Sequence, residues 1–255
     1  MSQILYNKED HIAYISLNNP ESLNALNLEM AKEFEAIWVD FRDDKEMWVA
    51  ILSGEGKSFC AGADVKKMER GGWQFRQSLI LGDYSVSSKR HNIWKPIIAA
   101  VHRHVYGAGL LLALESDIRI ASDDALFGIP EGKVNVPTLF APFASRYMPR
   151  AIACELLYTG RPIDAQRAYQ VGIVNKVVSR DQLISSATEI GKQICENGPL
   201  SIWATKELFC RGEDMNYEAA LALIEHIVPP IFNSEDSVEA KRAFIEKRKP
   251  VWKLK

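Results

Sequence analysis

The sequence predicts an α/β protein, and two features of the residue pattern support this fold class. Short apolar runs alternate with amphipathic stretches over the first two-thirds of the chain, whereas the last third is helical in composition. Small-residue turns at residues 60–64 and 106–109 connect strand ends to helix starts. Since no low-complexity linker separates the two parts, we expect an α/β core over residues 1–195 and a C-terminal helical region over residues 196–255.

The first half of the chain alternates strand and helix patterns. Alternating apolar residues predict a hairpin over residues 4–17 with its turn at residues 8–10. Asn27 is placed to cap a helix over residues 28–41, whose apolar residues recur at helical spacing. Residues 71–92 lack clean periodicity and predict a less regular segment. Buried strands are expected at residues 49–53, 96–101 and 117–121, and a short apolar helix at residues 110–114.

The second half is predominantly helical. The expected helices cover residues 143–159, 164–171, 182–196, 200–211, 217–232 and 234–247. One further strand is expected at residues 172–178. Ser179, Pro199 and Ser234 stand at the starts of helices and are the predicted caps.

The segment from residue 95 to residue 131 carries the residues best suited to chemistry. Gly107 and Gly109 leave the main chain bare where a strand turns into a helix, so backbone N–H groups converge there. Glu131 follows on a segment punctuated by Pro130. Amide donors with one carboxylate suit a reaction in which a carbonyl becomes an oxyanion while a proton moves. A tight packed turn and a surface glutamate are the alternative interpretation.

Composition and charge exclude several classes of protein. The formal net charge is −2, so no global field attracts nucleic acid or an anionic membrane. The four cysteines (Cys60, Cys154, Cys195, Cys210) lack metal-ligand spacing, and free thiols in a reducing cytosol are expected. No signal-peptide pattern or bilayer-length apolar run is visible. We expect a cytoplasmic protein with no metal and no membrane or nucleic-acid partner.

Histidines offer a second, weaker candidate site. A strand through residues 102–104 would place His102 and His104 on one face, as a metal pair or an auxiliary base. No third ligand stands nearby in the sequence, which favours a structural role. His91 is the other candidate for proton handling.

Five collinear segments resemble the crotonase superfamily, also called the enoyl-CoA hydratase/isomerase family. Residues 58–66 (SFCAGADVK) match its oxyanion segment, and residues 19–26 (NPESLNAL) match its N-x-P-x-x-x-N-A-L pattern. Residues 106–118 resemble the second oxyanion segment. Residues 159–174 and 243–250 also match, so the resemblance covers essentially the whole chain.

The resemblance implies a fold, an assembly and an oxyanion hole. The implied fold is a crotonase-like spiral of ββα repeats with a C-terminal helical trimerisation region, and the implied assembly is a homotrimer or homohexamer. The main-chain N–H groups of Ala63 and Ala108 are implied to hold the thioester carbonyl of an acyl-CoA. No cofactor is implied apart from coenzyme A as part of the substrate.

The same resemblance implies contacts with coenzyme A and the acyl group. Lys66 stands where relatives place a lysine near the phosphates. Phe244 and Lys247 match terminal-helix positions that contact coenzyme A, often from a neighbouring subunit. Glu21 replaces a lysine that many relatives carry, so part of the usual phosphate clamp is absent. The remaining substrate-binding positions carried over are Leu26, Ala61, Asp64, Val65 and Leu111.

The sharpest departure from the family pattern is Leu111. Hydratases of the family usually present two glutamates that activate one water, and leucine occupies the first position while Glu131 keeps the second. A single carboxylate beside an oxyanion hole resembles the enoyl-CoA isomerases of the family, in which it removes a proton at C2 and returns it at C4. We expect the apolar neighbours of Glu131 to raise its pKa. The sequence therefore favours enoyl-CoA isomerisation.

Other functions remain open at this point. The segment after Glu131 lacks the family's usual glycine loop and contains Pro137, Phe140 and Pro142, which predicts a different acyl pocket. A hydratase or dehydratase of an unusual enoyl-CoA, a cyclic one included, is the first alternative, and hydrolase and decarboxylase branches also exist. An inactive acyl-CoA-binding scaffold and an RNA-binding protein are alternatives from other classes, and the near-neutral charge disfavours the latter.

Overall fold

The fold is built on two β-sheets. The computed structural model describes residues 2–64 and 85–255. The larger sheet has the order β1-β2-β3-β4-β6-β9, and all its neighbours are parallel except the β1–β2 hairpin. Its strands are β1 (Ile4–Glu9), β2 (Ile12–Leu17), β3 (Val49–Gly54), β4 (Ile97–Val101), β6 (Ile118–Ser122) and β9 (Lys176–Val178). The smaller sheet consists of β5 (His104–Tyr106), β7 (Leu126–Gly128) and β8 (Ile163–Asp164).

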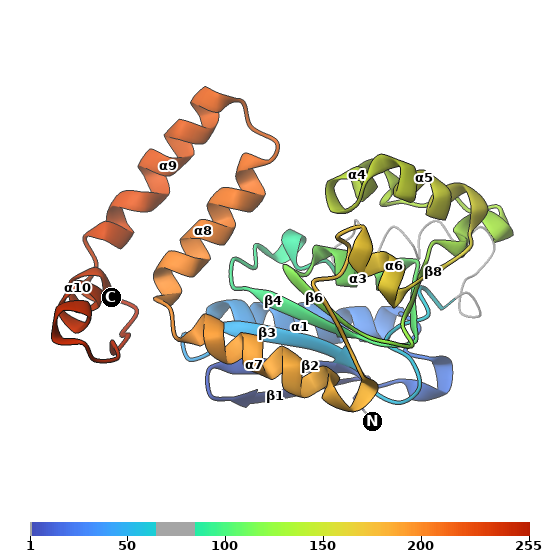
Figure 1. Ribbon diagram of the computed structural model, residues 1–255, viewed down its shortest axis with the longest axis horizontal. Coiled ribbons are helices and arrows are strands. Elements are labelled where there is room, and N and C mark those ends of the chain that lie inside the picture. The colour runs from blue at the N-terminus through green and yellow to red at the C-terminus, as the bar shows by residue number, and fades with distance from the viewer. Residues whose placement is uncertain (1, 65–84) are drawn as a thin grey trace.

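Helices cover the sheets and dominate the C-terminal part of the chain (Figure 1). Their bounds are α1 (Leu28–Asp43), α3 (Ala108–Glu115), α4 (Ala144–Tyr147), α5 (Arg150–Thr159), α6 (Ala165–Gln170), α7 (Leu183–Cys195), α8 (Pro199–Gly212), α9 (Tyr217–Phe232) and α10 (Glu235–Glu246). Short 3-10 helices are η1 (Pro20–Ser22), η3 (Lys89–His91), η4 (Pro130–Val134), η5 (Ala141–Phe143) and η6 (Arg180–Gln182). No helix within these described ranges is long and apolar enough to cross a membrane.

Side chains on the central strands alternate between two hydrophobic cores, as the period of a strand dictates. On β3, Ala50 and Leu52 face the core that contains α1 and α3, whereas Val49 and Ile51 face the core formed with α7. Both faces of the sheet are therefore covered, which explains why the parallel strands are nearly continuous in apolar residues.

The C-terminal helices α8 and α9 form a hairpin that projects from the core, and α10 lies beyond it with the C-terminus (Figure 1). Polar contacts anchor the start of this region. Lys206 on α8 forms an ion pair of 2.7 Å with Asp117 and donates to the carbonyl of Lys95. Trp203 donates to the carbonyl of Trp48 at 3.2 Å. The boundary between residues 195 and 196 stays a prediction.

Several predicted element bounds agree with the structure. Asn27 caps α1, since its side chain accepts from the N–H of Met30 at 3.0 Å, and Ser234 caps α10 in the same manner. Helix α9 has the predicted limits, and α7 and α8 agree to within one residue at each end. The short apolar helix α3 is longer than predicted, because it begins at Ala108 and ends at Glu115.

Other predicted bounds are wrong, for local backbone reasons. The helix predicted over residues 143–159 is interrupted before Pro149, because a proline disfavours helical geometry in the residue that precedes it; Met148 is extended. The strand predicted over residues 172–178 begins only at Lys176, since Gly172 has a φ of +79° and the chain folds back onto α6. Ser179 makes no side-chain cap. The hairpin turn lies at residues 10–11.

Candidate active site

The two predicted oxyanion segments run side by side in the structure. The N–H of Cys60 donates to the carbonyl of His104 at 2.9 Å, and the N–H of Tyr106 donates to the carbonyl of Cys60 at 3.0 Å. A Cβ placed on Gly62 would lie 3.0 Å from the carbonyl oxygen of Tyr106 and 3.8 Å from the nitrogen of Ala108. The segment before Ala63 therefore touches the turn before Ala108.

The amide of Ala63 is directed by the hydrogen bonds of its neighbours. The carbonyl of Gly62 accepts from the N–H of Leu26, and the N–H of Asp64 donates to the carbonyl of Leu26, both at 2.8 Å. In a trans peptide the N–H points opposite to the preceding carbonyl. The N–H of Ala63 therefore points away from Leu26. Gly62 has a φ of +99°, which permits this bend.

The amide of Ala108 is directed by the start of α3. Gly107 precedes the helix with a φ of 52° and a ψ of −120°, and its carbonyl accepts from the N–H of Leu111 at 3.1 Å. Because that carbonyl points into the helix, the N–H of Ala108 points out of the helix amino end. This end of a helix favours negative charge, as an oxyanion requires.

Glu131 lies against the same turn. A Cβ placed on Gly107 would lie 2.6 Å from Oε1 of Glu131 and 3.3 Å from its Cδ. The parallel pairing of β5 and β7, with Tyr106 opposite Gly128, brings the two segments to one edge of the small sheet. Pro130 begins η4 and carries the glutamate inward, where 8% of it is exposed. The carboxylate thus stands one residue from the Ala108 amide.

The residues of α3 that follow this turn are apolar and buried. Leu111, at the position of the missing glutamate, is 4% exposed, and Leu110 is fully buried. Cys60 is also buried here, and its burial raises the pKa of the thiol to about 12. This thiol therefore stays protonated near neutral pH and is no nucleophile.

The predicted substrate-binding residues of the first oxyanion segment have different surroundings. Leu26 is fully buried, and its main chain holds residues 62–64 in place. The N–H of Ala61 donates to the carbonyl of Leu23 at 3.0 Å, and Asp64 is buried. Val65 and Lys66 lie outside the described residues, so their predicted contacts stay predictions.

Phe244 and Lys247 are not brought to this site within one chain. Phe244 is 86% exposed on α10, and Lys247 ends that helix with a φ of 52°. Helix α10 lies at the far left of Figure 1, whereas α3 lies in the right half. Within one chain, α10 therefore lies away from the proposed site.

The histidines do not form the paired arrangement that a single strand would give. Arg103, between His102 and His104, has a φ of 52° and breaks the strand between β4 and β5. The ring of His102 is buried against the carbonyl of Gly56, and His104 contacts the hydroxyl of Ser58. His91 lies against the carbonyl of Ser85. No metal-binding group of three ligands occurs in the part of the chain that the structure describes.

Sequence reasoning missed one polar side chain near this site. Glu115 ends α3, four residues after Leu111, and its carboxylate lies near Ser87 and Ser88. The available signal was the spacing of four, which places both residues on one helix face.

Comparison with known proteins assigns this chain to a family. The family model for enoyl-CoA hydratase/isomerase matches residues 7–255. The chain belongs to the enoyl-CoA hydratase/isomerase family. It is an enzyme of the crotonase superfamily and has the crotonase fold.

Relatives of this enoyl-CoA hydratase/isomerase family member match over nearly their full length. The short-chain-enoyl-CoA hydratase of Clostridium acetobutylicum is 36% identical over 98% of this chain and 97% of that protein. The (E)-benzylidenesuccinyl-CoA hydratase of Thauera aromatica is 37% identical over 96% of each chain. The crystal structure of an enoyl-CoA hydratase from Mycobacterium tuberculosis superimposes with a TM-score of 0.91 at 32% identity, covering 99% of both chains.

Proposed function

We propose that this enzyme isomerises an enoyl-CoA thioester, with Glu131 as its single acid/base and the amides of Ala63 and Ala108 as the oxyanion hole. The observation that carries the proposal is the position of the Glu131 carboxylate directly against Gly107, next to the Ala108 amide. Chemistry at the carbon adjacent to a thioester carbonyl needs these two functions within a few ångströms of each other.

The reaction follows from the positions of these groups. With a 3-enoyl thioester bound, the Glu131 carboxylate takes a proton from C2, and the electron pair of the broken C–H bond moves into a dienolate. Its negative oxygen accepts hydrogen bonds from the two amides. The dienolate then takes the proton from Glu131 at C4, which leaves the double bond between C2 and C3. Removing one such oxyanion donor typically costs about a hundred- to a thousandfold in kcat.

Leu111 supports isomerisation over the two-carboxylate hydration scheme. A leucine can neither take nor give a proton, and its burial leaves that side of the pocket apolar. Isomerisation returns the same proton that it removes and adds no water, so one carboxylate is sufficient.

Hydration of an enoyl-CoA is the second candidate, and the names of the relatives favour it. Two of the most similar curated proteins are called hydratases. Glu131 alone would then take a proton from water, whose oxygen adds to C3, and deliver that proton to C2. The reshaped segment after Glu131 favours an unusual acyl group in this case.

A substrate panel separates the candidates. The 2-enoyl-, 3-enoyl-, cyclic-enoyl- and 3-hydroxyacyl-CoA thioesters are incubated with the enzyme in water and in deuterated water, and products are identified by mass spectrometry. Isomerisation predicts migration of the double bond without net addition of water. A 3-hydroxyacyl product from a 2-enoyl substrate would contradict it and favour hydration, and free acid or lost carbon dioxide would indicate the hydrolase or decarboxylase branch.

We also propose that coenzyme A is bound across two copies of the chain. In this arrangement Leu26, Ala61, Asp64, Val65 and Lys66 contact it from one copy, with Leu111 at its acyl end. Phe244 and Lys247 contact it from the other copy, and their exposure on a helix remote from Glu131 supports this division. No cofactor other than the coenzyme A of the substrate takes part in the proposed reaction.

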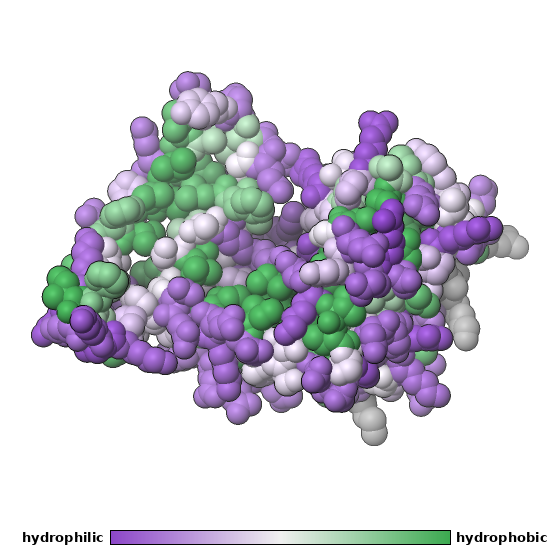
Figure 2. All heavy atoms as spheres, viewed as in Figure 1, coloured by the Kyte–Doolittle hydropathy of each residue, from purple (hydrophilic) through white to green (hydrophobic). Residues whose placement is uncertain are grey.

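Self-association as a homotrimer or hexamer is the assembly that we propose. Hydrophobic side chains gather over α8 and α9 in Figure 2, and Phe209 and Phe232 are 70% and 68% exposed. Exposed apolar patches of this kind mark interaction surfaces. Sedimentation of the purified enzyme tests the proposal, and a monomer at micromolar concentration would contradict it.

A further inference from the structure

Ala108, Leu111 and Glu115 share one face of helix α3. Ala108 and Leu111 are buried, and Glu115, at the end of the helix, is partly buried. These three residues are spaced i, i+3 and i+7, so they form one stripe along the helix. The stripe begins at the proposed oxyanion hole and ends at Glu115.

Glu115 has an unusual environment at the end of this stripe. Its carboxylate lies near the hydroxyl of Ser87 and the main chain at Ser88. Its Oε2 atom is nevertheless buried and has no hydrogen-bond partner among the described residues. Leaving a buried polar atom without a partner is unfavourable, and such atoms are rare in folded proteins. Burial also raises the pKa of this carboxyl group.

Glu115 lies farther along α3 from the proposed oxyanion hole than Leu111 does. Seven residues of helix rise by about 10.5 Å, and side chains lean toward the helix amino end by about one turn. The Glu115 carboxylate therefore lies roughly 5–8 Å from the Ala108 end of α3, beyond the side chain of Leu111. An acyl chain that follows this face from the thioester passes the leucine before it reaches the glutamate.

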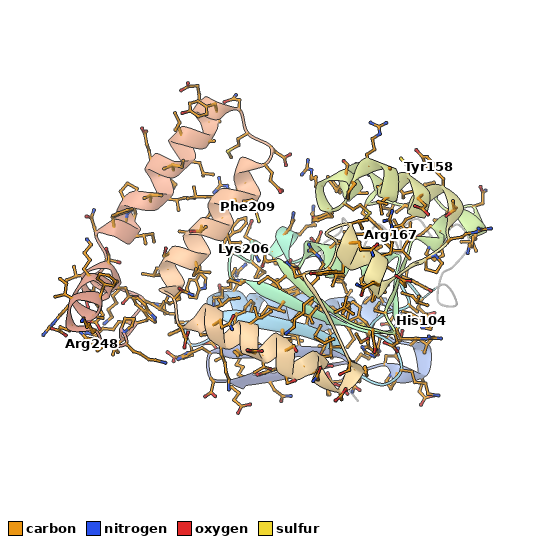
Figure 3. The ribbon with its side chains drawn as sticks, viewed as in Figure 1. His104, Tyr158, Arg167, Lys206, Phe209 and Arg248 are labelled. Carbon is orange, nitrogen blue, oxygen red and sulfur yellow. The ribbon has the colours of Figure 1, made fainter. Side chains whose placement is uncertain are left out.

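Further polar groups surround this position. The ammonium of Lys89 lies over the ring of Tyr147, 5.1 Å from its centroid, and both residues lie close enough to Glu115 to interact with its charge. Lys206, which Figure 3 shows on α8, is a further positive charge close enough to Glu115 to interact with it. The far end of the stripe is thus polar, unlike a pocket for a plain hydrocarbon.

We propose that Glu115 is a specificity residue that recognises a hydroxyl group on the acyl chain, several bonds beyond the reacting carbons. A hydroxyl group both donates and accepts, so it satisfies the Oε2 atom whether the carboxyl is ionised or protonated. A hydrocarbon chain would leave that atom without a partner. The inference rests on the proposed function, because it assumes that the thioester lies at Ala63, Ala108 and Glu131.

The test compares matched thioesters with and without the hydroxyl group. Binding of hexanoyl-CoA and 6-hydroxyhexanoyl-CoA to the full-length wild-type enzyme is measured by calorimetry, and kcat/KM is measured for the 2-enoyl and 3-enoyl forms of both. We expect the hydroxylated compounds to be favoured about ten- to a hundredfold, the ratio that corresponds to one satisfied buried polar atom. Equal binding of the two saturated compounds to the wild type would overturn the inference without any variant.

Variants assign the preference to Glu115. In Glu115→Met the ratio of kcat/KM between hydroxylated and plain substrates should fall to near one, while Glu115→Gln, which keeps hydrogen-bonding atoms, should retain part of it. Glu189→Met is the matched control, because Glu189 is exposed on α7, which packs on the opposite face of the sheet. Persistence of the full preference in Glu115→Met would refute the role.

The same experiment separates this inference from the proposed reaction. Turnover of plain enoyl-CoA without any discrimination would overturn the role of Glu115 and leave the reaction standing. Preferential binding of 6-hydroxyhexanoyl-CoA without turnover of any enoyl-CoA would support the role of Glu115 and contradict the reaction.

Discussion

Replacing Gly107 by alanine tests the geometry on which the proposed reaction depends. The new Cβ would lie 2.6 Å from Oε1 of Glu131, which is closer than two such atoms approach without displacement. The substitution also strains the backbone, since residue 107 has a φ of 52° and a ψ of −120°. Both effects act at the junction between the acid/base and the Ala108 amide.

The expected loss follows from these two contributions. Backbone strain of this kind costs about 1–3 kcal/mol of stability. The clash is relieved by moving the Glu131 carboxylate or the helix start by about an ångström, and a displacement of that size costs about a hundredfold in rate. We therefore expect kcat to fall by about two orders of magnitude or more while the protein remains folded.

Gly172→Ala is the matched control for this variant. Gly172 also has a positive φ, +79°, but nothing lies within 4 Å of the position that its Cβ would occupy. The Gly172→Ala enzyme should lose about 1–2 kcal/mol of stability and keep the wild-type kcat. Rates are followed by the ultraviolet absorbance of the conjugated enoyl thioester, and stability by urea denaturation. A folded Gly107→Ala enzyme with wild-type kcat would refute the proposed placement of Glu131.

Three further outcomes are expected. Glu131→Gln should lower kcat by about a hundred- to ten-thousandfold, because the amide cannot move the proton. Calorimetry should show that hexanoyl-CoA still binds to this variant. A kcat near that of the wild type would refute the catalytic role of Glu131. Phe209→Glu should weaken self-association in sedimentation experiments, since it places a charge on an exposed apolar face. An unchanged assembly would exclude that face from the interface. Burial lowers the pKa of His102 to about 4, from 6.5. The unfolded chain therefore binds more protons between pH 4 and 6.5, and stability should fall by up to roughly 3 kcal/mol as the pH decreases through that window. Urea titrations of wild type and His102→Gln should differ in this pH dependence, and parallel curves would contradict the assignment.

Helix periodicity and capping residues predict elements of this protein well when their signals are local. The apolar spacing of residues 28–41 and the cap at Asn27 specify α1, since both act within a few residues. The break at Pro149 was missed because apolar periodicity continues through it, although proline geometry is itself a local signal. The late start of β9 depends on Gly172, whose backbone conformation the periodicity does not report.

Some residues of the candidate site could be predicted from the sequence, and one could not. The residue types at positions 63, 108 and 131 could be read from the chain, because small residues and one glutamate stand in recognisable segments. Glu115 could not be assigned from the pattern alone, since a glutamate at the end of an apolar helix usually faces solvent. Its burial depends on Ser87 and Ser88, which the fold brings from another segment.

The sequence by itself determined the fold class, the family and the absence of a proton-handling side chain at position 111, because each depends on residue identity and local spacing. Only the tertiary structure decided which groups meet. The parallel bridge between Cys60 and Val105 of β5, and the pairing of β5 with β7, bring Gly62, Gly107 and Glu131 close together. Such contacts join segments far apart in the chain, and local propensity carries no information about how those segments pair.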